Sequence, residues 1–387
     1  MGGAAASSAP ARVRPSGVPA RPPRDTRLDI FRGLLQLAIF ASHATGTWLG
    51  VWLIPAPWGL SDSSEQFVFL SGFTLGSVFA RKAVRDGWAE ASADLLRRTW
   101  RLYRTHLLVL ALFALAIAVA DATLLPGEAQ KTDWAPVFAQ PWASLPGLLL
   151  TVVQPNYMGI LPLFVWCMLL LPGFAAAEAR WADRALLVPL AVYAVAWAFA
   201  APATGWERGL GYNPLAWQLI FLLGAWLGRR ALLRGRALPF RAFWARWATV
   251  GAVAMLGFGV WQQLGWHGFA GGARVPAVAW LLDKKDLAPL RLLHAMAQAW
   301  LVAAFVPREA NWMHLALPRC IAAIGRHSLQ VFCVGLFLSW GASVVFRLTP
   351  YSLALDLSLI GGGFVLLSVF AWWRERRLAL ARVSLAG

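Results

Sequence analysis

Long apolar stretches alternate with short polar or basic segments along nearly the whole chain. Each apolar stretch is about 20 residues long, the length at which a helix crosses a bilayer core of roughly 30 Å. The pattern predicts an all-α, polytopic membrane bundle of about ten transmembrane helices. We expect the spans at residues 28–53, 64–81, 105–124, 157–177, 185–203, 213–229, 247–266, 288–306, 320–345 and 351–373. Shorter apolar pieces at 144–153 and 275–282 are expected to be re-entrant or interfacial.

The two ends of the chain differ from this pattern. Residues 1–25 are rich in Ala, Pro, Ser, Gly and Arg and lack apolar periodicity, so a disordered, basic cytoplasmic tail is expected. Residues 26–377 form the predicted membrane domain, and residues 378–387 form a short cytoplasmic tail. The first apolar run follows a long basic segment and is long enough to span, so we do not expect a cleaved signal peptide.

Composition and charge support a membrane protein. The chain is 59% hydrophobic and 14% charged, with a mean hydropathy of +0.58, whereas a soluble domain is about 25% charged. A net charge of +17 would suggest nucleic acid in a soluble protein. Here the basic residues lie between apolar spans, so we expect contact with membrane lipids and no nucleic-acid partner.

The placement of Lys and Arg predicts the orientation. If the N-terminus is inside, the inner segments carry 26 of the 35 basic residues and the outer segments carry 6. Inner loops of membrane proteins are enriched in Lys and Arg, so both termini are predicted to be cytoplasmic.

Cysteine and tryptophan positions suggest packing and anchoring. Three cysteines lie in apolar spans without metal-ligand spacing, so neither a disulfide nor a metal site is predicted; they are Cys167, Cys320 and Cys333. Several of the 23 tryptophans lie near span ends and are interpreted as interface anchors, with carbohydrate stacking as the alternative. These are Trp48, Trp52, Trp58, Trp206 and Trp266.

Four polar residues share one face of the first predicted span at 100° per residue: Asp29, Arg32, Gln36 and His43. Such groups must point into the bundle, because exposure to lipid is costly. His43 lies about 16 Å beyond Arg32 along a helix axis, towards the outer side. A histidine in this setting is a candidate general base, and a buried structural network is the alternative.

The second span begins with two acidic residues at the expected depth of His43. Asp62 suits a helix cap, and Glu65 lies one turn further in. Either carboxylate is a candidate to orient the imidazole and support an imidazolium. Ser71 and Gly72 are interpreted as a close-packing pair.

The wider pattern resembles a known family. Arg32 and His43, separated by ten residues and followed by Phe-Val-Phe-Leu-Ser-Gly-Phe at 67–73, resemble the acyltransferase family 3 membrane enzymes. The full set of ordered segments is similar to OpgC, the branch that succinylates osmoregulated periplasmic glucans. These segments are 27–43, 61–72, 100–104, 160–163, 213–218, 283–294 and 325–333. The departures are Gly159, where the family tends to carry an acidic or polar residue, and the pair Lys285 and Asp286.

The resemblance implies an enzyme of the bacterial inner membrane, with acyl-CoA as cytoplasmic donor and a periplasmic glucan as acceptor. Succinyl-CoA is the expected donor substrate, and no permanently bound cofactor is expected. CoA phosphates should stay at the basic inner face, where the candidate residues are Arg98, Arg101, Arg104, Arg326 and His327. Topology and anionic lipid are the alternative explanation for these arginines, and packing is the alternative for Arg326 and His327.

The acceptor and acyl group are expected to meet residues of the outer half. Asn213, Trp217 and Gln218 begin the sixth span and offer hydrogen bonds and stacking. An arginine within an apolar helix needs a partner, which a glycan or a carboxylate would supply. The further candidate substrate contacts are Asp29, Gln36, Lys284, Arg291 and His294, with a structural ion pair as the alternative for Arg291.

These residues define one mechanism and several rivals. His43 is expected to remove the proton of an acceptor hydroxyl, which attacks the thioester. Glu65 or Asp62 steadies the imidazolium, and a nearby arginine such as Arg32, or a polar helix group, supports the oxyanion. An acyl-histidine intermediate stays open. The rival functions are a glycan exporter or flippase, a non-catalytic scaffold, and an acetyl rather than succinyl transferase.

Overall fold

The computed structural model describes residues 25–53, 58–198, 210–235, 242–269 and 280–384, and no strand occurs among them. The predicted tail at 1–24, Trp206 and residues 275–279 lie outside the described residues. The first half contains α1 (Thr26–His43), α2 (Trp48–Leu53), α3 (Ser63–Asp86), α4 (Trp88–Thr123), α5 (Glu128–Lys131), α6 (Ala135–Ala139), α7 (Pro141–Leu149) and α8 (Ile160–Trp181). The second half contains η2 (Ala182–Leu186), α9 (Leu187–Ala198), α10 (Pro214–Arg234), α11 (Ala242–Trp266), α12 (Pro289–Phe305), η5 (Asn311–His314), α13 (Ala316–Arg326), α14 (Ser328–Leu348) and α15 (Leu353–Ser384).

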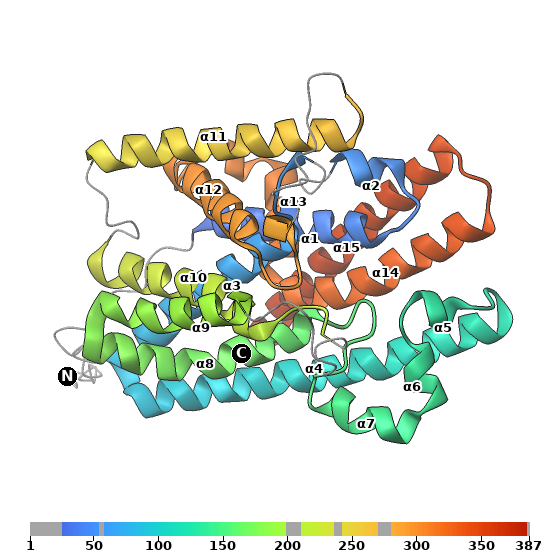
Figure 1. The fold of residues 1–387 in the computed structure, drawn as a ribbon, viewed down its shortest axis with the longest axis horizontal. Coiled ribbons are helices and arrows are strands. Elements are labelled where there is room, and N and C mark those ends of the chain that lie inside the picture. The colour runs from blue at the N-terminus through green and yellow to red at the C-terminus, as the bar shows by residue number, and fades with distance from the viewer. Residues whose placement is uncertain (1–24, 54–57, 199–209, 236–241, 270–279, 385–387) are drawn as a thin grey trace, which may run out of the picture.

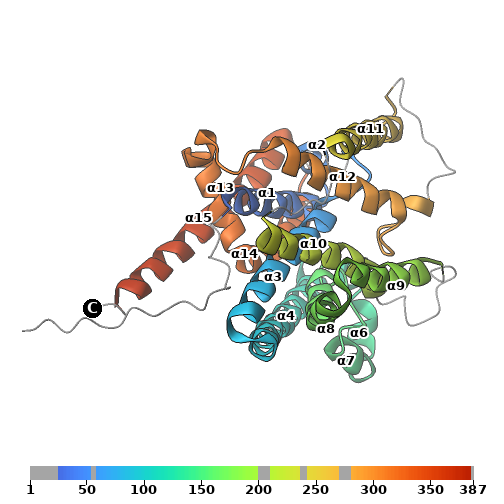
Figure 2. The same cartoon turned by 90° about the vertical axis from the view of Figure 1, so that its left-hand side faces the viewer.

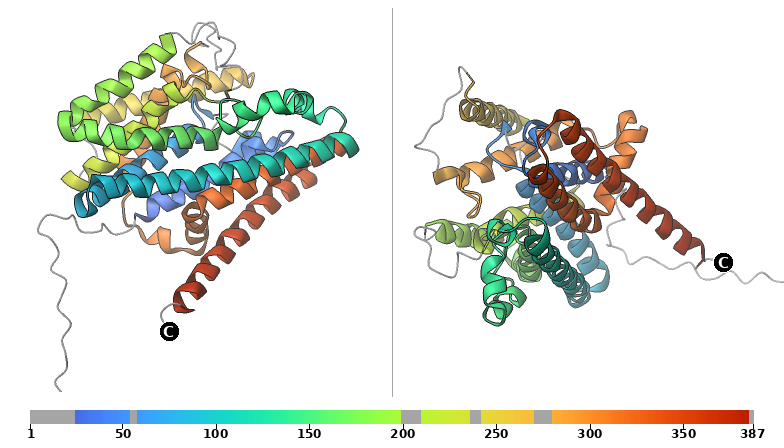
Figure 3. Two further views of the ribbon diagram at one scale, coloured as in Figure 1. Left: turned by 90° about the horizontal axis from the view of Figure 1, so that it is seen from below. Right: turned by 90° about the vertical axis from the view of Figure 1, so that its right-hand side faces the viewer.

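The long helices form a bundle with roughly common axes. Helices α4, α8, α10, α11 and α14 run along the long direction of the molecule in Figure 1. Helix α15 leaves this bundle at an angle, as Figure 2 and Figure 3 show. It continues as helix to Ser384, so the described part of the predicted tail at 378–387 is helical.

Among the described residues, six helical segments are long and apolar enough to cross a membrane. They are Ser63–Asp86, Trp88–Thr123, Ile160–Ala198, Phe243–Gly265, Ser328–Leu348 and Leu353–Ala381. The segment Ile160–Ala198 contains α8 and α9, and the chain turns back between them at η2 (Figure 1). Helices α1, α10 and α12, predicted as spans, fall outside this set of apolar helices, so the count of ten stays a prediction.

Two of the predicted spans are each broken into two helices. The span at 28–53 is α1 followed by α2, with a turn between His43 and Trp48. Asp356 of α15 causes this restart, because its carboxylate accepts hydrogen bonds from the backbone N–H groups of Trp48 (2.8 Å) and Leu49 (3.0 Å). The span at 320–345 is α13 followed by α14, with the break at His327.

Glycines allow the helices beside the site to approach closely. A Cβ added at Gly72 of α3 would lie 2.0 Å from the backbone oxygen of Phe221 in α10. A Cβ at Gly228 of α10 would lie 1.9 Å from the backbone oxygen of Phe73 in α3. The close-packing prediction for Gly72 is therefore confirmed, and α3 is held directly against α10.

Candidate functional site

His43 is the last residue of α1 and is half-buried. Its Nδ1 lies 2.8 Å from the backbone oxygen of Ile39, one turn earlier. The Ser42 hydroxyl is 3.1 Å from the same nitrogen and donates to the same Ile39 oxygen. Because a carbonyl oxygen only accepts, Nδ1 carries the proton of the neutral ring and Nε2 keeps its lone pair. Within the part of the chain that the structure describes, Nε2 has no hydrogen-bond partner, so it is free to accept a proton.

Tyr157 contacts His43 and was not singled out by the sequence reasoning. The two ring centroids are 5.7 Å apart, and the Tyr157 hydroxyl donates to the backbone oxygen of His43 at 3.3 Å. The buried Ser343 hydroxyl donates to the same oxygen at 3.2 Å. Tyr157 has a φ of +72°, a conformation that non-glycine residues rarely adopt unless their surroundings hold them there. Together these contacts fix the end of α1.

The start of α3 carries two carboxylates in a capping box. Asp62 is the N-cap and accepts from the backbone N–H of Ser64 at 2.7 Å. Glu65 accepts in return from the backbone N–H of Asp62 at 3.0 Å. The capping interpretation of Asp62 is therefore confirmed. Both carboxylates also have oxygens that face other elements.

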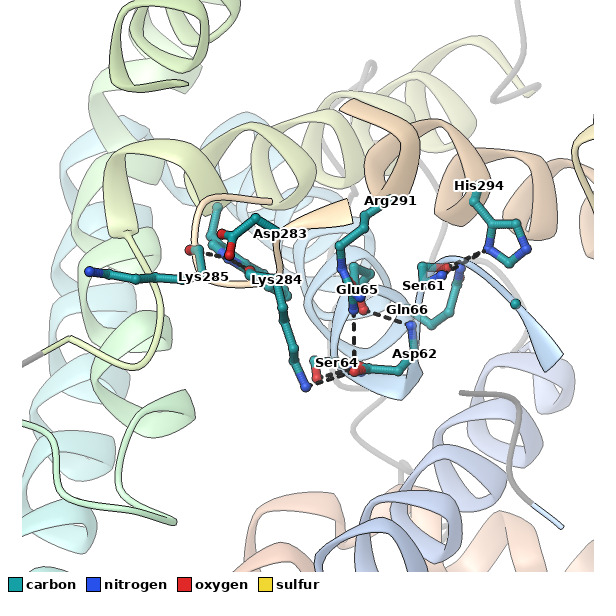
Figure 4. A network of polar contacts seen from close by, with 12 residues as sticks. Ser61, Asp62, Ser64, Glu65, Gln66, Asp283, Lys284, Lys285, Arg291 and His294 are labelled. Carbon is teal, nitrogen blue, oxygen red and sulfur yellow. Dashed lines mark hydrogen bonds and ion pairs between the residues drawn. The ribbon is translucent and has the colours of Figure 1, made fainter. Parts of the chain in front are cut away.

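Two cations from a segment far along the chain lie against these carboxylates (Figure 4). Arg291, near the start of α12, lies 2.5 Å from Glu65 and 3.3 Å from Asp62. Lys284, from the loop before α12, lies 2.6 Å from Asp62. We call Asp62, Glu65, Lys284 and Arg291 the charge cluster. Arg291 gives the completely buried Glu65 a charged partner, which reduces the cost of burying this residue.

The surroundings keep the exposed half of the charge cluster ionised. Burial alone would raise the pKa of the Asp62 carboxyl, but Lys284 and Arg291 hold this pKa well below its usual range. Burial would lower the pKa of the Lys284 ammonium, but Tyr212 and Asp62 raise it above its usual value. Asp62 and Lys284 are therefore both charged across the physiological pH range.

The charge cluster lies beside His43 without bonding to it. Lys284 and Asp62 are near enough for their charges to act on the imidazole. Among the described residues, neither Asp62 nor Glu65 hydrogen-bonds the ring, so the predicted carboxylate–imidazole contact is not observed. The carbonyl of Ile39 holds Nδ1 instead. Of the two carboxylates, Asp62 influences His43, and it does so only through space.

His294 bonds a serine beside the charge cluster. Its Nδ1 lies 2.7 Å from the hydroxyl of Ser61, and both residues are almost completely buried. A Cβ at Gly59 would lie 2.5 Å from the His294 ring, so the chain passes tightly over it. His294 thereby holds the chain segment that leads into Asp62. Contact between His294 and the substrate stays a prediction.

Two of the residues predicted at the start of the sixth span, Asn213 and Trp217, hold the loop that carries Lys284. Asn213 caps α10 and donates to Asp286 at 2.8 Å. The buried Trp217 indole donates to the backbone oxygens of Lys284 (3.1 Å) and Lys285 (3.0 Å). Gln218 donates to the backbone oxygen of Pro189 at 2.8 Å. The first two therefore position Lys284, while their contact with a sugar stays a prediction.

The polar residues at the inner half of α1 point into the bundle, as expected. Asp29 and Gln36 are buried. Arg32 donates to the backbone oxygen of Leu70 (2.9 Å) and to the hydroxyl of Thr74 (2.6 Å), both on α3. These contacts join α1 to α3, and they place Arg32 apart from the charge cluster.

A cavity of about 630 Å³ lies between α4 and the start of α14. It is lined by three of the four arginines predicted for the donor, together with apolar and uncharged polar groups: Arg98, Arg101, Leu102, Arg104, Thr105, Leu108, Leu329 and Gln330. Arg98 pairs with Asp94 at 3.0 Å. Arg101 and Arg104 line the same space from the exposed side of α4.

Arg326 and His327 lie just before the α14 residues of that cavity. Arg326 forms an ion pair with Glu375 of α15, and His327 Nε2 lies 3.9 Å from the same carboxylate. A Cβ at Gly325 would lie 1.9 Å from the backbone oxygen of Asp29. The predicted packing of this segment against α1 is therefore observed.

Within the described part of the chain, no group of three or more His, Cys, Asp or Glu side chains could hold a metal ion. In comparisons with known proteins, a family model described as OpgC protein matches residues 24–378. No curated protein and no solved structure matches the chain. The matched range contains His43, the charge cluster and the cavity beside α4.

Proposed function

This chain belongs to the OpgC family, and from that premise we propose that it is a membrane O-acyltransferase acting on a glucan. In the proposed reaction an acyl group, expected to be succinyl, moves from cytoplasmic acyl-CoA to a hydroxyl of a periplasmic glucan. The protein would lie in the bacterial inner membrane. Its six long apolar helices support a membrane location.

The observation that supports this function most is the state of the His43 ring. With Nδ1 donating to the Ile39 oxygen, Nε2 is the basic atom. Nε2 takes the proton of the acceptor hydroxyl as its oxygen attacks the thioester carbonyl. The tetrahedral intermediate then loses CoA as the C–S bond breaks, and the imidazolium returns its proton to the leaving thiolate.

The cavity beside α4 supports a CoA-type donor. Its volume of about 630 Å³ lies in the range of small-molecule sites. Three arginines offer planar donors for phosphate oxygens, while Leu102 and Leu108 offer apolar contact. We propose that the phosphates of acyl-CoA bind here.

A succinyl group fits the outer site through its free carboxylate. Lys284 is 41% exposed, the most accessible cation of the charge cluster. Its partner Asp62 is shared with Arg291, so an incoming carboxylate can take the place of Asp62 at Lys284 without leaving Asp62 unpaired. Arg291 is already held by Glu65, so we assign the acyl carboxylate to Lys284 first.

The test is thioester turnover by the purified protein. Protein in lipid nanodiscs is mixed with succinyl-CoA and a β-glucan oligomer, and free thiol is followed with time. Glucan-dependent thiol release and a succinyl mass on the oligomer are expected. Thiol release with acetyl-CoA but not with succinyl-CoA would support acyl transfer and reject succinyl as the transferred group. No release with either donor would reject the enzyme in favour of a glucan exporter or scaffold.

A further inference from the structure

An aromatic cluster lies beside the end of α1. Trp52 of α2 is its centre, with ring centroids of Trp48 at 5.8 Å, Trp58 at 5.4 Å and His267 at 5.0 Å. Phe269 meets Trp52 edge-on at 6.1 Å. The Trp58 indole donates to the backbone oxygen of Trp52 at 2.9 Å, which fixes its orientation. Three separate stretches of chain therefore bring five rings together.

The aromatic cluster adjoins the candidate site on two sides. A Cβ at Gly50 of α2 would lie 2.6 Å from the backbone oxygen of Ala41, so α2 folds back against the last turn of α1, where His43 lies. Trp58 is followed by Gly59, which touches the ring of His294. Trp48 and Trp52 therefore lie on the helix that follows His43, and Trp58 lies directly before the glycine that contacts His294.

The rings remain open to the surroundings despite their mutual contacts. Trp48 is 54% exposed and Phe269 is 49% exposed. Single tryptophans at span ends anchor a protein in the membrane interface and need no contact with one another. Here the rings contact one another at tilted or edge-on angles and one indole is hydrogen-bonded, which builds a rigid surface. Apart from His267, the side chains of the aromatic cluster are not ionisable, so the cluster suits a neutral partner.

We propose that Trp48, Trp52 and Trp58, supported by His267 and Phe269, form a platform on which pyranose rings of the acceptor glucan stack. The apolar C–H face of a pyranose lies against an aromatic face, while its hydroxyls stay in water. Bound in this way, a neighbouring sugar unit presents its hydroxyl to His43. This inference rests on the proposed function, and it adds the site that selects a polymeric acceptor over a single sugar.

The experiment separates binding from catalysis. Binding of a β-glucan octamer is measured by titration calorimetry with the wild type, His43→Ala, Trp48→Ala, Trp48→Phe and Trp142→Ala in nanodiscs. Trp142, on α7, is 84% exposed, with no ring contact to the cluster, and it serves as the matched interface tryptophan. Wild type, His43→Ala and Trp142→Ala should bind alike. Trp48→Ala should lower the affinity for the octamer roughly fivefold, and Trp48→Phe should recover most of this loss.

A kinetic comparison provides the second readout. Trp48→Ala should raise the KM for the octamer by a similar factor and leave the KM for a disaccharide and the kcat unchanged. Equal octamer binding by Trp48→Ala and wild type would overturn the platform, as would an equal loss in Trp142→Ala. Octamer binding by wild type without acyl transfer would reject the proposed enzyme but not the platform. Acyl transfer without octamer binding would reject the platform but not the proposed enzyme.

Discussion

Arg291 holds the charge cluster together, because its guanidinium contacts Glu65 and Asp62 at once. Glu65 has no exposed surface, so its carboxylate depends on this partner for compensation. Removing one member of a buried pair leaves an uncompensated charge, whereas removing both often costs little.

Arg291→Met should therefore destabilise the protein by about 3 kcal/mol, and Glu65→Gln together with Arg291→Met should recover most of that loss. Thermal unfolding in detergent, followed by circular dichroism, measures both variants. Asp62 keeps Lys284 as a partner in each case. Equal destabilisation of the single and the double variant would mean that the pair is not the source of the effect.

The sequence could predict which residues of the site are polar and buried, but not which of them meet. His43 and Glu65 stand out because lipid-crossing helices exclude such groups. The partner of Arg291 lies 226 positions away in the chain, and no local pattern reports such a distance. Tyr157 was missed for the same reason, since an aromatic residue in a loop shows no periodicity.

Helices α3 and α10 owe their contact to glycines on both sides. Gly72 and Gly76 lie one turn apart on α3, and Gly224 and Gly228 have the same spacing on α10. Each would place a Cβ within 2.3 Å of backbone on the other helix. This contact matters for the site, because the start of α3 carries Asp62 and the start of α10 holds the loop of Lys284.

Gly228→Ala should destabilise the bundle by about 1–3 kcal/mol, because the new methyl group forces the helices apart. Gly173→Ala is the matched control, since a Cβ at Gly173 of α8 meets nothing within 4 Å. The control should keep or slightly raise the thermal midpoint, because alanine favours helix over glycine. Equal midpoints for both variants would contradict the close packing.

The cavity beside α4 makes a separate prediction for the donor. Arg101→Glu should raise the KM for acyl-CoA roughly tenfold or more, since hydrogen bonds to charged groups contribute about 1.5–3 kcal/mol. The effect should shrink at high salt. Arg97→Glu is the control, because Arg97 is a neighbouring exposed arginine of α4 that does not line the cavity. Equal changes in the KM for acyl-CoA in both variants would mean that Arg101 serves only as a signal for membrane topology.

Helix positions followed from hydropathy, but helix breaks did not. The apolar run at 28–53 gives no sign of ending at His43, because Asp356, the residue that restarts the helix, lies more than 300 positions away. The break at His327 falls inside the predicted span at 320–345, at the polar segment Arg326-His327-Ser328. The first break comes from a tertiary contact, which a window of local hydropathy does not report.

At the scale of the whole molecule, the Lys and Arg bias predicts one orientation, with both termini cytoplasmic. Helices α4 and α15 run in opposite directions, and α15 ends towards the end of the bundle where α4 begins (Figure 3). Reporter proteins fused after Gly387 and within residues 229–246 should be cytoplasmic, and one near Asp133 should be periplasmic. A periplasmic reporter after Gly387 would overturn the orientation and the assignment of donor and acceptor sides.

We propose that this protein transfers an acyl group to a periplasmic glucan and that His43 is the general base. Mass spectrometry of periplasmic glucans from matched strains tests it most directly: a strain without the gene, and the same strain carrying wild-type protein or His43→Ala at equal membrane levels. Losing a general base costs about 10²–10⁴ in rate. Succinylated, acidic glucans should therefore appear with the wild type and be absent with His43→Ala. Equal glucan succinylation with both proteins, or identical glucans in all three strains, would contradict the account.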